Sequence, residues 1–271
     1  MLICPVCSLP LSLGEKNAVC RHGHNFDRAR EGYWNLLLSS SGKGHGDDKE
    51  MLLARRAFLE AGHYEHLLFA LREALFPLFP PGGVLVDAGC GEGYYTEGVA
   101  VDLSERGKKP SLFAFDVSKN AARLTAKRLG GKGCVFVGSC YRAPIASSAA
   151  DAILSLFSPF AGEEFLRILK PGGFLIRAVP MPEHLFALKR AVYENPVKNE
   201  KEAPVPQGLF LVDQKRVRKE IFLHSGEEIR SLFSMTPYAH KTSREDMAKL
   251  ERIASLRVET DFGLLVYRKK G

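Results

Sequence analysis

The first 24 residues contain cysteine and histidine side chains with the spacing of a metal site. Cys4 and Cys7 are separated by two residues, and Cys20 and His24 follow after twelve more, which gives C-x2-C-x12-C-x3-H. Thiolate sulfur with one imidazole favours zinc, held in a closed tetrahedron that leaves no position for a reacting water. His22 is an alternative fourth ligand, and ordinary thiols near the terminus are the alternative to a metal site. We predict one structural zinc ion per chain at Cys4, Cys7, Cys20 and His24.

A second candidate site is a glycine-rich segment directly after the apolar run 84–86. Asp87 ends this run, and Gly89, Gly91 and Gly93 follow with the spacing G-x-G-x-G. Dinucleotide-binding proteins use G-x-G-x-x-G instead, and no P-loop lysine follows here. The glycines allow a sharp turn and bring a ligand close to main-chain amides. An acid at the end of the strand suits a ligand with an ammonium group, which favours S-adenosylmethionine. A purely structural turn is the alternative.

Asp116 ends the next apolar run, 111–116, and lies 29 residues after Asp87. A carboxylate at this position can accept hydrogen bonds from both hydroxyls of a ribose. The turn 171–173, Pro-Gly-Gly, precedes a further apolar run and is frequent in the same methyltransferase fold. The glycine loop, Asp116 and the Pro-Gly-Gly turn follow one another in the order found in methyltransferases. This order argues against a purely structural role for the glycine loop. Asp151 is expected to be a polar residue at the start of a strand.

The elements that must position these residues alternate between strand and helix after residue 83. Strands separated by helices indicate a parallel, doubly wound sheet. The predicted helices begin near Tyr94 and cover 119–129, and the predicted strands are 84–87, 111–116, 134–137, 152–157 and 174–179. The expected fold class is α/β, the Rossmann-like and mostly parallel sheet of class I S-adenosylmethionine-dependent methyltransferases, with a small N-terminal zinc-binding module.

Composition along the chain predicts three parts. Residues 1–38 form the zinc-binding module, and 39–62 combine a Gly- and Ser-rich linker with a connecting helix. Helical apolar spacing runs from residue 50 to residue 79 with a break near Gly62. Residues 63–271 form the methyltransferase domain. It includes a proline-rich surface insertion at 196–207 and one or two edge strands in Leu256–Tyr267.

The overall charge of the 271 residues is basic, with 38 Lys and Arg against 31 Asp and Glu and a net charge of +7. This excess suits a polyanionic partner. No apolar run approaches the roughly 18 residues that span a bilayer, and the N-terminus lacks the layout of a secretory signal. Three of the six cysteines fall in the first 20 residues, unlike a secreted disulfide framework. We expect a cytoplasmic protein without a membrane segment.

Several short segments add to the zinc spacing, and among them the run Arg55–Tyr64 is far more specific than any Rossmann-like loop. They are His24-x-Phe26-Asp27, Glu31-Gly32-Tyr33-x-Asn35-Leu36-Leu37, Gly46-Asp47, Ala54–Leu59, Gly62-His63-Tyr64, Gly89–Thr96, Asp116–Lys119, His184-Leu185, Met235-Thr236-Pro237 and Thr260-Asp261-Phe262. With these segments the chain resembles the family of 23S ribosomal RNA guanine-N1 methyltransferases over nearly all of its length. Two segments depart from the family pattern: the linker 39–49, which is shorter and less basic, and Ser155–Phe160.

The resemblance implies a reaction and partners. Members transfer a methyl group from S-adenosylmethionine to N1 of a guanine in hairpin 35 of 23S ribosomal RNA. They are homodimers whose zinc modules line an RNA-binding cleft. The resemblance also implies zinc at the four ligands given above, and cofactor contacts from Tyr64, Gly91, Glu92 and His184, with Asp116 as the ribose ligand. Packing at a helix end is the alternative for Tyr64, and a surface helix cap is the alternative for His184.

Transfer to guanine N1 requires loss of the N1 proton and alignment of the nitrogen with the sulfonium methyl group. We expect the target base near Ser158-Pro159-Phe160. This segment lacks the Asn/Asp-Pro-Pro-Tyr tetrapeptide of methyltransferases that act on exocyclic amines. No general base can be assigned from the sequence. Candidate contacts to phosphates and bases are Arg28, Arg30, Arg55, Arg56, Tyr33 and Trp34. A solvated charged face is the alternative for these cations.

Two other functions are compatible with this pattern. The chain could be a methyltransferase of another RNA, of a small molecule or of a protein. It could instead be a non-catalytic RNA-binding assembly factor that keeps the fold as a relic. The intact glycine loop favours cofactor binding, which argues against the relic.

Overall fold

The computed structural model describes residues 1–38, 46–199, 205–236, 238–239 and 242–271. Most of the Gly- and Ser-rich linker (39–45), the middle of the expected insertion (200–204) and Pro237 lie outside the described residues. Within the described ranges, the chain forms one sheet of three strands and one of eight. The small sheet is antiparallel and belongs to the N-terminal segment. Its strands are β1 (Ser12–Leu13), β2 (Asn17–Val19) and β3 (Asn25–Asp27).

The large sheet has the strand order β10-β11-β9-β8-β5-β6-β7-β4. Neighbouring strands from β9 to β4 are parallel, whereas β11 is antiparallel to both β9 and β10. A mostly parallel sheet of this kind confirms the predicted fold class. The strands are β4 (Tyr33–Asn35), β5 (Val84–Ala88), β6 (Ser111–Asp116), β7 (Cys134–Val137), β8 (Ala150–Leu156), β9 (Leu169–Pro180), β10 (Leu209–Leu223) and β11 (Leu256–Lys269).

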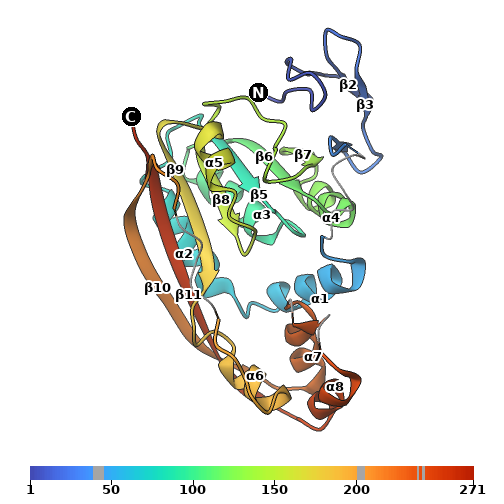
Figure 1. The fold of residues 1–271 in the computed structure, drawn as a ribbon, viewed down its shortest axis with the longest axis vertical. Helices are drawn as coiled ribbons and strands as arrows, with labels where there is room; N and C mark the ends of the chain where they lie inside the picture. The colour runs from blue at the N-terminus through green and yellow to red at the C-terminus, as the bar shows by residue number, and fades with distance from the viewer. Residues whose placement is uncertain (39–45, 200–204, 237, 240–241) are drawn as a thin grey trace.

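Helices cover both faces of the large sheet (Figure 1). Because successive strand residues point to opposite faces, the buried side chains separate into two cores. Leu85 packs with residues of α2, α3 and α4, whereas Val86 packs in the core that contains α5 and the N-terminal segment. None of the helices among the described residues has the length and apolar character needed to cross a membrane. The helices are α1 (Lys49–Glu60), α2 (Glu65–Leu75), α3 (Tyr94–Glu105), α4 (Lys119–Leu129), α5 (Gly162–Ile168), α6 (Phe186–Val192), α7 (Gly226–Ser234) and α8 (Arg244–Glu251).

The predicted elements around the glycine loop agree closely with the structure. The ranges predicted for β6, α4 and β7 are confirmed, α3 begins at Tyr94 as expected, and β5 and β8 agree within two residues. The Pro-Gly-Gly turn at 171–173 differs, because β9 already begins at Leu169. There the pairing of β8 with β9 shifts register between Ala150 and Ala152, so the turn is an irregularity within the strand.

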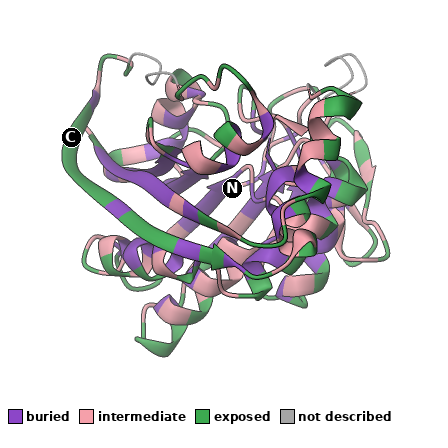
Figure 2. Ribbon diagram, turned by 90° about the horizontal axis from the view of Figure 1, so that it is seen from below, coloured by how far each residue is buried: buried purple, intermediate pink, exposed green. Residues whose placement is uncertain are grey.

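The expectation of one or two edge strands in Leu256–Tyr267 is wrong. This segment belongs to a single strand, β11, which lies between β9 and β10 and is largely buried. The edge strand is β10, which the sequence analysis does not predict. Most of its side chains are exposed (Figure 2), so its charged sequence shows no apolar face from which a strand could be recognised.

β4 joins the N-terminal segment to the large sheet. Its three residues pair in parallel with β7, opposite Val135–Val137. Leu2 forms a further bridge with Ile145. Trp34 in β4 is only 5% exposed and packs in the same core as Phe136. The end of the 1–38 segment is therefore the outermost strand of the sheet.

Candidate metal and cofactor sites

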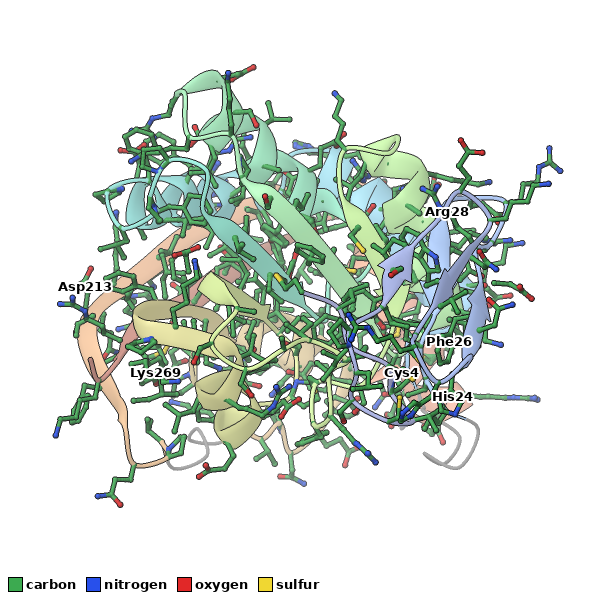
Figure 3. The ribbon with its side chains drawn as sticks, turned by 90° about the horizontal axis from the view of Figure 1, so that it is seen from above. Cys4, His24, Phe26, Arg28, Asp213 and Lys269 are labelled. Carbon is green, nitrogen blue, oxygen red and sulfur yellow. The ribbon has the colours of Figure 1, made fainter. Side chains whose placement is uncertain are left out.

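Cys4, Cys7, Cys20 and His24 converge in the N-terminal segment, where Figure 3 shows Cys4 beside His24. Their ligand atoms all lie within 4.8 Å of one another. The sulfur atoms of Cys7 and Cys20 are 3.6 Å apart, and His24 Nδ1 lies 3.6 Å from Cys4 Sγ and 3.3 Å from Cys20 Sγ. Zn–S bonds of about 2.3 Å in a tetrahedron place two sulfur atoms about 3.8 Å apart. The four side chains therefore fit a zinc ion, and the alternative ligand His22 is not part of the cluster.

Two backbone turns shape this cluster. The Ser8 nitrogen donates to the Cys4 carbonyl at 2.8 Å, and the Gly23 nitrogen donates to the Cys20 carbonyl at 2.9 Å. Burial opposes ionisation of Cys20, but hydrogen bonds, of which the one with the His24 backbone is the strongest, lower its pKa to about 6. A thiolate is the form that binds a metal. The local fold thus prepares a zinc site.

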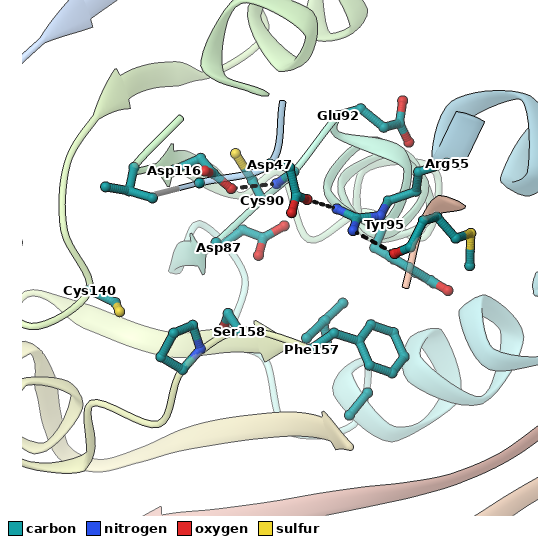
Figure 4. A pocket seen from close by; sticks show the side chains of 18 of the residues that line it. Asp47, Arg55, Asp87, Cys90, Glu92, Tyr95, Asp116, Cys140, Phe157 and Ser158 are labelled. Carbon is teal, nitrogen blue, oxygen red and sulfur yellow. Dashed lines mark hydrogen bonds and ion pairs between the residues drawn. The ribbon is translucent and has the colours of Figure 1, made fainter. Parts of the chain in front are cut away.

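A cavity of about 760 Å³ lies at the carboxyl ends of β5, β6, β8 and β9 (Figure 4). Open α/β sheets bind ligands at this end of their strands. The cavity brings together residues from distant parts of the chain, including α1, the glycine loop and the segment after β8. The predicted cofactor residues that line it are Tyr64, Asp87, Gly89, Gly91, Glu92, Asp116 and His184.

The three glycines of the loop have left-handed backbones, with φ of 85° at Gly89, 57° at Gly91 and 91° at Gly93. A Cβ atom at Gly89 would lie 2.5 Å from the Cβ atom of Ser158, so only glycine fits there. Gly93 does not line the cavity. A Cβ atom on it would meet Thr125 at 3.0 Å, so the missing side chain lets α3 begin close to α4.

Asp87 is buried in the cavity wall. Its Oδ2 atom accepts a hydrogen bond from Thr96 Oγ1 at 2.5 Å, whereas Oδ1 has no partner among the described residues. Burial raises the pKa of Asp87 to about 7; the Thr96 hydroxyl lowers it and the nearby Asp116 raises it. A buried acceptor without a partner is costly, so a ligand cation would bind there favourably.

Asp116 links the glycine loop to the end of β6. Its Oδ2 atom accepts from the Gly91 nitrogen at 3.0 Å and its Oδ1 atom from the Ser118 nitrogen at 2.8 Å. Burial raises the pKa of Asp116 even though both hydrogen bonds lower it. Each oxygen keeps acceptor capacity for a ribose hydroxyl.

Glu92 is 1% exposed and is already paired within the chain. Its carboxylate accepts from Arg56 Nε at 3.0 Å, from Arg128 Nη2 at 2.7 Å and from the Tyr94 nitrogen at 3.1 Å. Figure 4 shows it directed away from Asp87 and Asp116. The side chain therefore holds the start of α3 in place, although the residue borders the cavity.

Tyr64 and His184 both line the cavity and pack together, with ring centroids 6.2 Å apart. The buried Tyr64 hydroxyl has no partner among the described residues. Burial lowers the pKa of His184 to about 3, so its imidazole is neutral. Since His184 Nδ1 accepts from the Asp261 nitrogen at 3.2 Å, the ring proton lies on Nε2.

Arg55, Arg56 and Trp34, which are candidate RNA contacts from the sequence, are engaged within the chain. Arg55 pairs with the Asp47 carboxylate, and Arg56 pairs with Glu92. Trp34 is too deeply buried to stack on a base. The two arginines do not form the solvated charged face that is the alternative, because their side chains are only 25% and 26% exposed, and their contacts with RNA stay a prediction.

Arg28, Arg30 and Tyr33 are the remaining expected contacts. Arg28 lies over the Trp34 ring at 4.7 Å, while Arg30 is exposed and Tyr33 is half-buried. Other residues line the cavity without being assigned as cofactor ligands from the sequence. Among them are Asp47, Arg55, Tyr95, Cys140, Arg177, Asn199 and Tyr238.

The cavity fits S-adenosylmethionine. Gly89 and Gly91 form a cradle without side chains, and the free carboxylate oxygen of Asp87 suits an ammonium group. The buried hydroxyls of Tyr64 and Tyr95 add two further polar atoms without partners among the described residues. The volume is in the range of cofactor pockets, about 300–1,000 Å³.

Comparison with known proteins agrees with both sites. The family model of the RlmA N-terminal domain, a zinc ribbon, matches residues 2–39, and a methyltransferase-domain model matches residues 86–177. A Micromonospora griseorubida protein named as a 23S rRNA (guanine-N1)-methyltransferase is 33% identical, over 94% of this chain and 91% of its own. The Streptomyces fradiae 23S rRNA (guanine(748)-N1)-methyltransferase is 30% identical, over 94% and 90%. YxjB of Bacillus subtilis, which bears the same family designation, is 27% identical, over 99% and 97%.

These relatives align along almost the whole chain, and the two family models cover its zinc cluster and its glycine loop. The chain is therefore an S-adenosylmethionine-dependent methyltransferase with an N-terminal zinc ribbon, and it belongs to the 23S rRNA (guanine-N1)-methyltransferase family.

Proposed function

We propose that this protein transfers the methyl group of S-adenosylmethionine to N1 of a guanine in hairpin 35 of 23S ribosomal RNA. The observation that carries the proposal is the shape of the cavity. One part of its lining is the glycine loop with Asp87 and Asp116, and residues 157–159 after β8 form a part that adjoins this loop. Membership of the family supplies the substrate class.

The cofactor side of the cavity would be held by four side chains. Asp87 Oδ1 accepts from the ammonium group, and Asp116 accepts from the ribose hydroxyls. His184 presents Nε2–H, a neutral donor suited to a carboxylate, and the Tyr64 hydroxyl is a second donor beside it. When bound, S-adenosylmethionine supplies an electrophilic methyl group on a sulfonium. The protein contributes mainly by positioning this group against the RNA base.

The RNA side would be the mouth of the cavity, where aromatic side chains are exposed. Phe157 is 46% exposed and Tyr141 is 65% exposed, and both line the cavity. A guanine within a hairpin must leave its stack before a methyl group can reach N1, and flipped bases are commonly held against aromatic rings. These two rings are suited to that task.

We also propose roles for the parts of the chain. Residues 1–38 act as an RNA-recognition module held by one structural zinc ion. Residues 39–62 connect this module to the methyltransferase domain and add α1 to the cavity wall, and 63–271 carry out the transfer. Arg21 and Arg30 are exposed cations on the first part and are candidate phosphate contacts. A ribosomal substrate would place the reaction in the cytoplasm.

The protein is further proposed to act as a homodimer. β10 is an edge strand with Phe210, Leu211 and Val212 exposed at 53%, 50% and 52%. An exposed edge strand can pair with a strand of another chain, and exposed apolar patches mark interaction surfaces. Light scattering should give about twice the monomer mass of 30.0 kDa. A monomer at micromolar concentration would contradict this part of the proposal.

The central experiment combines the purified protein with S-adenosylmethionine and a transcript of hairpin 35. Mass spectrometry of the digested RNA should find one N1-methylguanine, and a Gly89→Arg variant should produce none. The same nucleoside should be missing from ribosomal RNA of a strain that lacks the gene. Methylation of another atom, or of a small metabolite in place of RNA, would reject the proposal.

A further inference from the structure

Arg177 is a buried cation in the cavity wall that none of the roles above uses. It lies on β9, opposite Ser155 of β8, and is only 4% exposed. Its guanidinium carbon lies 4.1 Å from the centroid of the Phe160 ring, which fixes the side chain by a cation–π contact. A guanidinium is a fixed positive charge with planar N–H donors.

Arg177 lines the cavity next to the segment after β8. The next residue of β9, Ala178, accepts through its carbonyl from the Phe157 nitrogen at 3.0 Å. Ser158 Oγ then donates to the Ala88 carbonyl at 2.8 Å, which anchors the same segment to the end of β5. Arg177 therefore lies beside the segment 157–160, near which the target base is proposed to bind, and its guanidinium contacts Phe160 of that segment.

The chemistry of guanine creates a need for a cation at this place. N1 of neutral guanine carries a proton, and its electron pair becomes available when that proton leaves. The resulting negative charge is shared between N1 and O6. A cation that donates hydrogen bonds to O6 stabilises this charge, and it does so more strongly in a cavity than in water. Arginine also pairs with O6 and N7 of guanine by two parallel hydrogen bonds.

We propose that Arg177 binds O6 of the target guanine and stabilises the anion from which the methyl transfer occurs. This inference rests on the proposed function. A solvent base, water or hydroxide, takes the N1 proton. The electron pair left on N1 forms the bond to the methyl carbon while the methyl–sulfur bond breaks and its pair stays on sulfur, which becomes neutral. Arg177 gains and loses no proton in this step.

The test compares Arg177→Met and Arg177→Lys with the unchanged protein. Arg268→Met is the matched control, because Arg268 also lies over a ring, Phe174, at 5.5 Å, but is exposed and outside the cavity. The measurements are kcat and KM on the hairpin transcript between pH 6 and pH 10, and S-adenosylmethionine affinity by calorimetry. Each variant is also assayed on RNA that carries 6-thioguanine at the target position, whose N1–H is more acidic than that of guanine.

Arg177→Met should lower kcat at pH 7 by about 100-fold or more, with cofactor affinity within about twofold of the original. Its rate should keep rising to higher pH than that of the unchanged protein, and 6-thioguanine should recover part of the loss. Arg268→Met should change none of these quantities. If Arg177→Met does not fold, Arg177→Lys serves for the same comparisons, since it keeps the charge but loses the planar pair of donors.

Two outcomes would overturn the role of Arg177. One is a variant with unchanged kcat, and the other is a loss that is equal at every pH and equal on both RNAs, as expected for a packing role. The proposed function fails separately. If the unchanged protein methylates an atom other than guanine N1, the substrate assignment is at fault whatever the Arg177 variants do.

Discussion

Glu92 Oε2 lies 2.7 Å from Nη2 of Arg128, so the acid next to the glycine loop is neutralised within the chain. Arg128 joins this buried carboxylate to Glu60 and Glu97, at 2.7 Å and 3.1 Å, and its own side chain is 12% exposed. The ion-pair network thereby connects α1, the loop, α3 and α4. The network holds the glycine loop through the Glu92 side chain, while Gly89 and Gly91 of the loop line the cavity.

Glu92→Gln should destabilise the fold more than it weakens cofactor binding. Removing the buried charge leaves Arg56 and Arg128 with only partly exposed partners, and we expect the free energy of unfolding to fall by about 2 kcal/mol. Urea denaturation measures this change. Glu73→Gln, which breaks an exposed pair with Arg106, is the control and should cost at most about 0.5 kcal/mol. A large loss of S-adenosylmethionine affinity without destabilisation would instead make Glu92 a direct ligand.

Cofactor affinity should depend on pH through Asp87. Burial raises the pKa of this group to about 7, so the carboxyl group is mostly protonated in the free protein below that pH. The ammonium group of the cofactor binds the ionised form of Asp87. The Asp87 carboxyl group must therefore lose its proton when the cofactor binds. The dissociation constant for S-adenosylmethionine should be about fivefold higher at pH 6 than at pH 7, a range in which the amino group of the cofactor stays mostly protonated. Calorimetry at pH 6 in buffers of different ionisation enthalpy should detect release of about one proton.

The raised pKa of Asp87 also determines whether the stability of the cofactor-free protein rises or falls with pH. Because the folded pKa of Asp87 is higher than the usual value of 3.8, the folded protein without cofactor binds more protons than the unfolded chain between about pH 4 and pH 7. The contribution of Asp87 to stability is therefore present at low pH and is lost as the pH rises through 7. Asp87→Asn should remove both pH dependences and bind cofactor weakly. A dissociation constant that is flat in the unchanged protein would exclude the ammonium contact.

Alanine should be tolerated less well at Gly89 than at Gly91. Both positions have positive φ, which costs about 1 kcal/mol or more for alanine. At Gly89 the new Cβ atom would also lie 2.5 Å from that of Ser158, whereas at Gly91 the nearest atom is Arg55 Nη1 at 3.6 Å. Thermal melting and calorimetry should show the larger loss of stability and of cofactor affinity for Gly89→Ala. Adding Ser158→Gly should recover part of the loss, and equal effects at the two glycines would contradict the contact.

Loss of one zinc ligand should separate RNA binding from cofactor binding. Cys7→Ser should abolish the stoichiometric zinc measured by atomic spectroscopy and weaken hairpin binding at least about tenfold, because a closed zinc site stabilises the fold of a small module. The four ligands do not line the cavity, so cofactor affinity should stay within about twofold. Cys134→Ser, outside the cluster, is the control and should keep its zinc. Full zinc content in Cys7→Ser would point to a different ligand set.

The central part of the fold and the zinc cluster could be predicted because they depend on local pattern. The residues that form each of these patterns are close together in the sequence. Examples are the apolar run of β6 and the ligand pair Cys4 and Cys7. β10 could not be predicted in this way, since its exposed faces leave no apolar alternation. Its partner β11 is an interior strand because β10 pairs with its outer edge. This pairing joins segments that are far apart in the sequence, so a local pattern does not reveal it.

Part of the candidate site could be predicted from the sequence, and part could not. Asp87, Asp116 and the loop glycines stand at strand ends, where the fold class alone places ligands. The roles of Arg55 and Glu92 depend on Asp47, Arg56 and Arg128, which no spacing connects to them. For Arg177 a signal was available: it interrupts the otherwise apolar run 175–179. A charge inside a buried strand indicates either a compensating partner or a functional site.

The hydrogen bonds between β4 and β7 have a consequence for substrate choice. β7 is the neighbour of β6, the strand that ends at Asp116, so the zinc ribbon is held at a set distance and angle from the reacting methyl group. If the ribbon binds the RNA as proposed, a guanine can reach the reacting group only where the RNA stem has the matching length and bend. Selection among guanines would then follow the architecture of the hairpin as well as the identity of the base.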